Sequence, residues 1–491
     1  MGVKTQALGK RILAGLGMLA LATAGIIGGA GAANAAEGNI DFGAEGSITV
    51  HKYSQPTTPS TEPATGLEQD VPAGAQLING VAFQVYNSGI DLENYTQAQW
   101  DAIDTLTAPA TPTGTLAGTG VTDNGEYTFG ELPVGVYYVY ETDVTNATFA
   151  DGTPANIATT AAPWVVVVPT AITDNDVTNW VYDIHVYPKN TTTTAPVKAV
   201  DDSAAVALGD TVTWPVTVNV PQINTAQGDA FTSIVLTDDL DSRLDFVSIS
   251  NVQYKGAAFD ASYYTVAPAA ATANGPVVTL TITPAGLTYL TGNSNGQLTF
   301  DIVTTVNSID GIGDEEAGFI TNIINQNING TDVDSNEVET LWGAVRIVKQ
   351  DATNDDLLDG AVFSVYATEA DAAARTNPIQ VGATDQTTFE TVDGVVTIPG
   401  LKATAEGTSY WIVEIEAPAG YVLDQTPREV TVTPGSTTDA FEIAVDNTKQ
   451  DFPGLPITGA NGALLFGLVG AAVLAIGLGL ALRARRNHTS A

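Results

Sequence analysis

The first chemical feature of the sequence is a small set of lysines in a chain without cysteine. With no cysteine, a cross-link within the chain or between copies cannot be a disulfide and must use other chemistry. The segment from Ala36 to Thr458 holds few lysines, so each position is informative; they are Lys52, Lys189, Lys198, Lys255, Lys349, Lys402 and Lys449.

One of these lysines follows a predicted strand. Residues 180–187 (WVYDIHVY) place positions 181, 183, 185 and 187 on one face and the alternate residues on the other. Pro188 is expected to end the strand ladder because it lacks an N–H donor. Lys189 is then expected to be an exposed amine at a strand end. From spacing alone, a solvated lysine on an edge strand is the simpler interpretation.

The C-terminal residues indicate a membrane segment preceded by a cleavage site. Leu455, Pro456, Ile457, Thr458 and Gly459 are followed by an apolar run over residues 460–482 and by Arg483, Arg485 and Arg486. About 20 apolar residues suffice to span a bilayer core, and the arginines fit the positive-inside rule. The alternative is an ordinary anchor helix after a chance LPITG.

The N-terminal residues are typical of secretion. Lys4, Lys10 and Arg11 precede an apolar run over residues 12–27, and cleavage is predicted after Ala35. Six of the 17 basic residues lie in this segment and the C-terminal tail, whereas none of the 55 acidic residues do. The region between them therefore has 11 basic and 55 acidic residues, and its net charge is 11 − 55 = −44. So acidic a surface repels nucleic acid and anionic membranes, and no nucleic-acid partner is expected.

Between these ends the sequence predicts an all-β protein. Short alternating segments such as 164–168, 277–282 and 429–432 are separated by turns, which favours tandem sandwiches. Little helix is expected, and residues 97–106 are one candidate for a short helix outside the sandwich.

An internal repeat relates the first and last parts of this region. Residues 48–52 (ITVHK) and 80–86 (GVAFQVY) correspond to residues 345–349 (VRIVK) and 360–366 (GAVFSVY). Each copy continues with a Tyr-x-hydrophobic-x-Glu strand that ends at Glu141 or Glu414. The middle part lacks the pattern. The predicted organisation is a signal peptide (1–35), three domains (36–190, 191–342 and 343–450) and a C-terminal segment (451–491).

Two motifs resemble those of sortase-assembled Gram-positive major pilins, of the kind found in actinobacterial fimbrial shafts. LPITG resembles the LPXTG sorting signal, and WVYDIHVYPK resembles the pilin motif. The resemblance implies that a sortase cleaves Thr458–Gly459 and joins Thr458 to Lys189 of a neighbouring subunit. Implied partners are other copies of the chain, pilus-specific and housekeeping sortases and peptidoglycan, with minor pilins and host-surface or glycan receptors as further candidates.

Residues 410–421 (YWIVEIEAPAGY) resemble the E-box of these pilins, YxLxETxAPxGY, with Ile412 and Ile415 as mild departures. The resemblance implies three tandem Ig-like sandwiches of collagen-adhesin B, A and B type. It also implies that Glu414 catalyses an isopeptide bond between Lys349 and Asn447. The alternative is a core Lys–Glu pair beside a turn asparagine.

The middle domain resembles the A-type domain, in which an aspartate replaces the glutamate. Lys198 is its candidate nucleophile, and Asp238 its candidate catalyst because it directly follows the predicted strand 234–237; Asp241 is the second choice. Asn322 is the favoured partner, with Asn325, Asn327 and Asn329 left open.

The first domain has Lys52, Glu141 and Asn190 at similar places, but no Ala-Pro-x-Gly-Tyr follows Glu141. No bond is therefore expected there, which would leave Lys189 accessible in a softer domain.

The function expected from these features is that of a structural shaft pilin on the cell surface; the alternative is a monomeric wall-anchored adhesin or a minor pilin. No enzymatic constellation, cofactor or metal site is expected. The three histidines do not form a convincing metal site or triad, and the acidic pairs at 238–239 and 355–356 lack EF-hand spacing, so they are interpreted as solvated turns.

Overall fold

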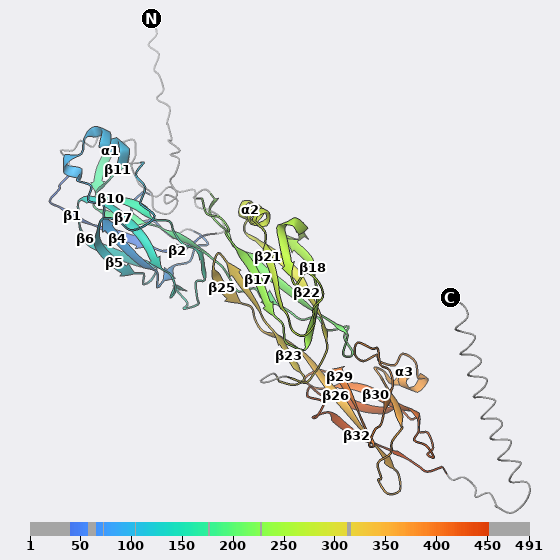
Figure 1. Cartoon of the computed structure of the whole chain (residues 1–491). Coiled ribbons are helices and arrows are strands. Elements are labelled where there is room, and N and C mark those ends of the chain that lie inside the picture. The colour runs from blue at the N-terminus through green and yellow to red at the C-terminus, as the bar shows by residue number, and fades with distance from the viewer. Residues whose placement is uncertain are drawn as a thin grey trace, which may run out of the picture.

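The computed structural model describes residues 40–56, 65–71, 73–103, 105–174, 177–225, 228–311 and 316–450. The strands fall into three groups that follow one another along an elongated molecule (Figure 1). The predicted all-β class and the tandem sandwiches are confirmed. The predicted signal peptide (1–35) and the segment 451–491 lie outside the described residues.

The first domain is a sandwich with a mixed sheet against an antiparallel one. The first sheet has the order β13-β1-β6 and the second β10-β7-β4-β5. Smaller pairings are β2-β14-β9, β11-β12 and β3-β8. Bounds are β1 Glu45–His51, β2 Tyr53–Ser54, β3 Ile78–Asn79, β4 Ala82–Asn87, β5 Thr115–Val121, β6 Glu126–Pro133, β7 Gly135–Asp143, β8 Thr148–Phe149, β9 Ile157–Thr159, β10 Trp164–Val168, β11 Thr170–Asp174, β12 Val177–Val181, β13 Asp183–Val186 and β14 Lys189–Thr192.

The continuous apolar run of β10 has a structural cause. Trp164, Val166 and Val168 face the core between the sheets, whereas Val165 and Val167 pack under an excursion that carries α1 (Gln97–Ile103) and the 3-10 helix η3 (Leu92–Asn94). Both faces of the strand are therefore buried, so the usual alternation is lost. The predicted helix exists and is shorter than residues 97–106.

The middle domain consists of two five-stranded sheets, β15-β16-β22-β18-β19 and β20-β21-β17-β24-β25. Strict alternation in β16 turns Val212, Trp214, Val216, Val218 and Val220 into the core. Bounds are β15 Val197–Lys198, β16 Thr211–Val220, β17 Ile234–Asp239, β18 Leu244–Tyr254, β19 Ala257–Ala258, η5 Ala261–Tyr263, β20 Tyr264–Ala267, β21 Val277–Ile282, α2 Pro284–Gly292, β22 Gly296–Val306, β24 Ile324–Ile328 and β25 Thr331–Asp334.

The third domain repeats the plan of the first. One sheet has β26 paired with β29 and β32, and also with β23 from the middle domain; the other has the order β28-β27-β30-β31. Bounds are β23 Phe319–Asn322, β26 Val338–Asp351, β27 Val362–Tyr366, α3 Glu369–Ala374, β28 Phe389–Glu390, β29 Val395–Lys402, β30 Thr408–Glu416, β31 Arg428–Val432 and β32 Phe441–Asn447. The repeat holds at the level of register, because Phe83 lies opposite Glu141 and Phe363 lies opposite Glu414.

The passage from the middle to the third domain is a continuous strand. β26 pairs with β23 through its first residues and with β29 and β32 through its later ones. Gly343 lies within it, where a Cβ would meet the Thr433 carbonyl oxygen at 2.1 Å, so the close approach of the two backbones requires glycine. Buried residues of both domains form one hydrophobic cluster, which favours a stiff junction.

Candidate functional site

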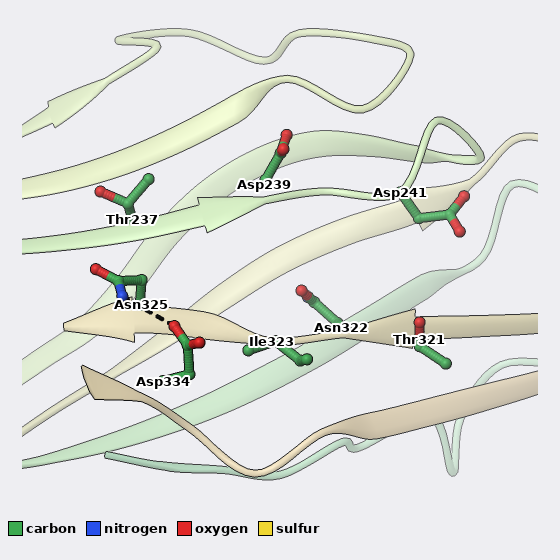
Figure 2. A pocket seen from close by; sticks show the side chains of 8 residues that line it. All are labelled: Thr237, Asp239, Asp241, Thr321, Asn322, Ile323, Asn325 and Asp334. Atoms are coloured by element: carbon green, nitrogen blue, oxygen red, sulfur yellow. Dashed lines mark hydrogen bonds between the residues drawn. The ribbon is translucent and has the colours of Figure 1, made fainter. Parts of the chain in front are cut away.

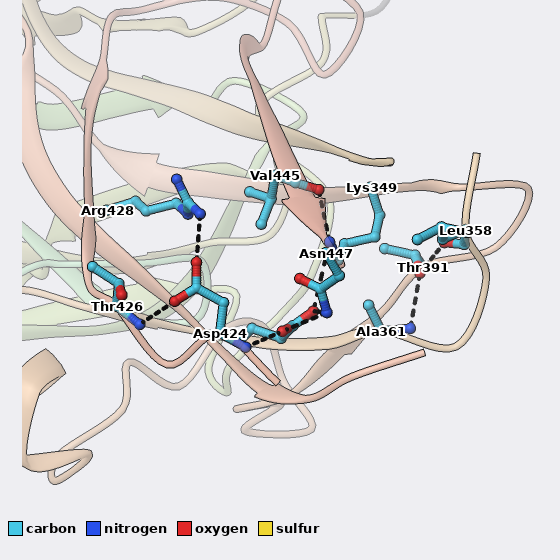
Figure 3. Close-up of polar contacts among 10 residues, drawn as sticks. Lys349, Leu358, Ala361, Thr391, Asp424, Thr426, Arg428, Val445 and Asn447 are labelled. Carbon is cyan, nitrogen blue, oxygen red and sulfur yellow. Dashed lines mark hydrogen bonds and ion pairs between the residues drawn. The ribbon is translucent and has the colours of Figure 1, made fainter. Parts of the chain in front are cut away.

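The third domain brings Lys349, Glu414 and Asn447 together in its core. β26 and β32 are parallel neighbours, and β30 of the facing sheet supplies Glu414. Asn447 Nδ2 donates to both Glu414 oxygens at 2.9 Å, and Lys349 Nζ lies 3.8 Å from Glu414 Oε1. Figure 3 shows Lys349 donating to the Val445 carbonyl (2.7 Å) beside Asn447.

This arrangement suits the attack of an amine on a carboxamide. Lys349 and Glu414 are almost fully buried, and burial lowers the pKa of Lys349 while Glu414 opposes that shift. A lysine with a lowered pKa is more often neutral and nucleophilic. Asn447 Oδ1 is buried and accepts no hydrogen bond within the described part of the chain, so its carbonyl is available for polarisation.

The middle domain pairs Lys198 with Asp238. Lys198 Nζ lies 2.5 Å from Asp238 Oδ2, and both side chains are buried. Burial lowers the pKa of Lys198 to about 8 although Asp238 opposes the shift. Burial likewise raises the pKa of Asp238, against the attraction of Lys198. Both shifts favour a neutral amine beside a neutral acid.

Of the four candidate asparagines, only Asn322 is both buried and next to this pair. The Asn322 side chain is close enough to Asp238 to oppose the rise in the pKa of that carboxyl. Its geometry does not meet the criteria of a hydrogen bond, and neither of its polar side-chain atoms has a hydrogen-bond partner among the described residues. Asn325, by contrast, donates to Asp334 at 2.8 Å (Figure 2). Asn327 donates to Asp332, and Asn329 to Thr159.

Asp241, the second choice as catalyst, has another partner. It accepts from Arg243, whose Nη2 lies 2.5 Å from Asp241 Oδ2, and the buried Arg243 also donates to the carbonyl oxygens of Glu316 and Phe319. Asp241 therefore neutralises a buried arginine rather than facing Lys198.

The first domain also brings a lysine, a glutamate and an asparagine together, although no bond was expected there. Lys52 Nζ lies 2.6 Å from Glu141 Oε2 and 2.5 Å from Asn190 Oδ1, and Asn190 Nδ2 donates to Glu141 Oε1 at 2.5 Å. Lys52, Asn190 and the Glu141 side chain are almost fully buried. Burial lowers the pKa of Lys52, with Glu141 opposing. This geometry removes the ground for expecting no bond.

The E-box residues that the first domain lacks have a structural task in the third domain. In the third domain Tyr421 donates to Asp351 at 2.8 Å and pairs through its backbone with Lys449, so the motif's last residues fasten the chain beyond β32. The Phe–Glu register and the Lys–Asn positions are the features that the first domain shares with the third.

Lys189 differs from the exposed amine that was expected. It begins β14, opposite Tyr53 of β2, so pairing resumes directly after Pro188 instead of ending there. Its side chain is half-buried, and its pKa is lowered by burial and by the nearby Lys52. Two residues later, Thr191 donates to the Gln222 carbonyl oxygen (3.4 Å) of the middle domain.

Other predicted features stand as follows. Thr458 and the rest of LPITG lie outside the described residues, and in the described ranges no helix is long and apolar enough to span a membrane. His51 and His185 contact each other at 2.8 Å, but in the same ranges no group of three or more His, Cys, Asp or Glu side chains could hold a metal.

Comparison with known proteins places this geometry in a family. Family models match residues 43–191 (Gram-positive pilin subunit D1, N-terminal domain), 193–341 (Sgo0707 N2 domain) and 343–449 (prealbumin-like fold domain). The type 2 fimbrial subunit of Actinomyces naeslundii is 31% identical, with 99% of this chain and 98% of the relative aligned. The chain is a Gram-positive fimbrial pilin.

Further relatives of this pilin agree. The type 1 fimbrial subunit of Actinomyces viscosus is 27% identical over 97% of the pilin and 98% of the relative. The full-length major pilin SpaD of Corynebacterium diphtheriae superposes with a TM-score of 0.64 at 26% identity, covering 84% of this chain and 99% of SpaD. The pilin is a major, shaft-type subunit, so it belongs to fimbriae on the surface of a Gram-positive cell, where it assembles with further pilin subunits.

Proposed function

We propose that a sortase polymerises this pilin by joining Thr458 of one subunit to Lys189 of the next. The sortase thiolate attacks the Thr458 carbonyl, the Thr458–Gly459 bond breaks, and the fragment 459–491 leaves with a protonated amino group. The Lys189 amine then attacks the thioester, forms an isopeptide bond and returns the thiol. The observation that carries the proposal is the presence of Lys189 and the LPITG sequence in one shaft pilin.

The setting of Lys189 supports this role. Burial and the charge of Lys52 lower its pKa, so a larger fraction of the amine is neutral at a given pH. β14 places Lys189 at the end of the first domain, close to the middle domain, whereas Thr458 follows the third domain. The first domain, which carries Lys189, and the third domain, after which Thr458 follows in the sequence, occupy opposite ends of an elongated molecule, which suits an open head-to-tail assembly.

We further propose that the basal subunit is transferred to peptidoglycan by a housekeeping sortase. The LPITG signal supplies the same Thr458 acyl group whether the acceptor is the Lys189 amine or an amine of peptidoglycan. The acceptor alone therefore decides between chain growth and wall attachment. The apolar run 460–482 and the arginines after it would hold each subunit at the membrane until it is cleaved.

Within each subunit, we propose isopeptide bonds Lys52–Asn190, Lys198–Asn322 and Lys349–Asn447. The neutral lysine attacks the carboxamide carbon, the C–N bond to the lysine forms, and the asparagine nitrogen leaves as ammonia. The carboxyl groups of Glu141, Asp238 and Glu414, each beside the lysine and asparagine of its domain, would polarise the carbonyl and relay a proton to the leaving nitrogen. These bonds serve where other secreted proteins use disulfides.

The polymer proposal is tested in the piliated cell by replacing Lys189 with Arg, which keeps the charge but removes the amine as an acyl acceptor. Wall material released by muramidase should lose its SDS-resistant ladder and leave a single pilin band. Lys255→Arg is the matched control, because Lys255 is exposed and lies in the middle domain. An unchanged ladder in Lys189→Arg would contradict the proposal, and a single band in the wild type would favour a monomeric adhesin.

A further inference from the structure

In the middle domain, the strands that carry the lysine and the asparagine of the proposed bond are held together differently from those of the other two domains. In the third domain β26 and β32 share a parallel ladder, so the register itself places Lys349 near Asn447. In the first domain β14 is a ladder neighbour of β2, which directly follows Lys52. In the middle domain Lys198 belongs to β15, which pairs with β16, while Asn322 belongs to β23, which pairs with β26. Among the described strands, no ladder joins β15 to β23 or β24.

A side-chain amide bridges this gap. Asn336 Oδ1 accepts from the Lys198 backbone N–H at 3.0 Å, and Asn336 Nδ2 donates to the Lys198 carbonyl oxygen at 2.9 Å. A carboxamide offers one acceptor and one donor side by side, as a peptide group does. Asn336 therefore pairs with both backbone groups of Lys198, as a residue in a neighbouring strand would.

Ser335, the residue before Asn336, connects the same loop to β24, the strand that pairs with β17, which carries Asp238. Ser335 N–H donates to the Ile324 carbonyl oxygen (2.9 Å), and Ile324 N–H donates to Ser335 Oγ (3.1 Å). Ile324 is in turn the register partner of Asp238 and lies two residues after Asn322. The loop thus links the backbone of the nucleophile to that of the acid and the electrophile.

We propose that Asn336 is a positioning residue for the Lys198–Asn322 bond. It fixes the backbone from which the Lys198 side chain extends, so that Nζ stays near Asp238 and the Asn322 carboxamide. The reaction requires the Lys198 amine and the Asn322 carboxamide to be held in a reactive orientation. A small displacement of either group slows such a reaction strongly. Gln326, which binds Thr193 and Thr194, holds the segment before β15 but not Lys198 itself. The inference rests on the proposed middle-domain bond.

The test follows bond formation during refolding. Mature chain (residues 36–458), recovered unfolded from inclusion bodies, is diluted into buffer, quenched at intervals and digested. The linked Lys198–Asn322 peptide is then quantified by mass spectrometry against the Lys349–Asn447 peptide as an internal clock. We expect Asn336→Ala to slow the middle bond by about tenfold or more relative to that clock. Asn336→Asp keeps the acceptor for the Lys198 N–H and should be slowed less.

Asn325→Ala is the matched control, since Asn325 binds Asp334 on the same sheet and does not contact Lys198. It should link at the wild-type rate. A positioning role predicts that Asn336→Ala lowers the rate by the same factor at every pH. A shifted pH midpoint, or wild-type kinetics in Asn336→Ala, would overturn the role while leaving the bond intact. Absence of the linked peptide from the wild type would instead refute the bond. Should Asn336→Ala fail to fold, seen as loss of the clock peptide, the Asn336→Asp rate decides.

Discussion

Lys52 Nζ lies 2.5 Å from Asn190 Oδ1, and the residue that precedes Asn190 in β14 is Lys189. An internal cross-link site and the proposed intermolecular one are thus consecutive residues of one short strand. This places the first domain's triad next to the point where subunits would be joined.

We expect the first domain to be cross-linked. Intact mass of the mature chain should fall short of the plain sequence by one ammonia for each of the proposed bonds, and Glu141→Gln should restore one of them because it removes the acid beside Lys52 and Asn190. Glu93→Gln, at an exposed site of the same domain, should leave the mass deficit unchanged. A wild-type deficit that Glu141→Gln does not alter would argue against this bond.

The third-domain bond should dominate the stability of that domain. Glu414→Gln should leave Lys349 and Asn447 in separate peptides after digestion. Because the bond closes a loop of roughly 100 residues, chain entropy predicts a loss of about 4–5 kcal/mol in the unfolding free energy of this domain, measured by denaturant unfolding. Glu416→Gln, exposed on the same strand, is the control and should remain linked and stable.

Substitutions at Asp238 and Asp241 should have different effects, the first on formation of the isopeptide bond and the second on the stability of the middle domain. Asp238→Ala should abolish the Lys198–Asn322 peptide, because it removes the acid that contacts Lys198. Asp241→Ala should keep the bond but destabilise the domain by about 3–5 kcal/mol, since it removes a carboxylate that binds the buried Arg243 guanidinium. Peptide mapping and denaturant unfolding of both variants would show whether these assignments must be exchanged.

The middle-domain reaction should slow in alkali. The reactive pair is a neutral Lys198 beside a neutral Asp238, which together hold one proton. The pKa of Lys198 is lowered to about 8, so above that pH the pair loses its last proton and the rate should fall about tenfold per pH unit. At low pH both Asp238, whose pKa is raised, and Lys198 bind a proton. The charged Lys198 amine is then not a nucleophile, so the rate should also fall on the acid side. Refolding over a pH series measures both limbs, and a rate that stays high well above pH 8 would mean that the amine alone controls the reaction.

Patterns of side chains within strands were sufficient to predict much of this protein. Alternation of apolar and polar residues predicted the sandwiches. The repeated Gly-x-x-Phe and Tyr-x-x-x-Glu segments predicted that the first and third domains share a fold, which the shared Phe–Glu register confirms. The sequence favoured Asn322 but left three other asparagines open, and burial next to Asp238 is what distinguishes Asn322 from them. The half-buried state of Lys189 was missed because strand pairing resumes after Pro188, through a partner strand that lies more than a hundred residues earlier.

The order of the cross-links along the chain determines which residues would bear tension in the proposed fibre. Pulling force would enter at Lys189, cross from Lys198 to Asn322 and from Lys349 to Asn447, and leave at Thr458, so that only residues 189–198, 322–349 and 447–458 are stretched. The body of the first domain precedes Lys189 and lies outside this path. Force applied at Lys189 would peel β14 away from β2 and β9, and a bond from Lys52 to Asn190 would stop that peeling one residue from where it starts.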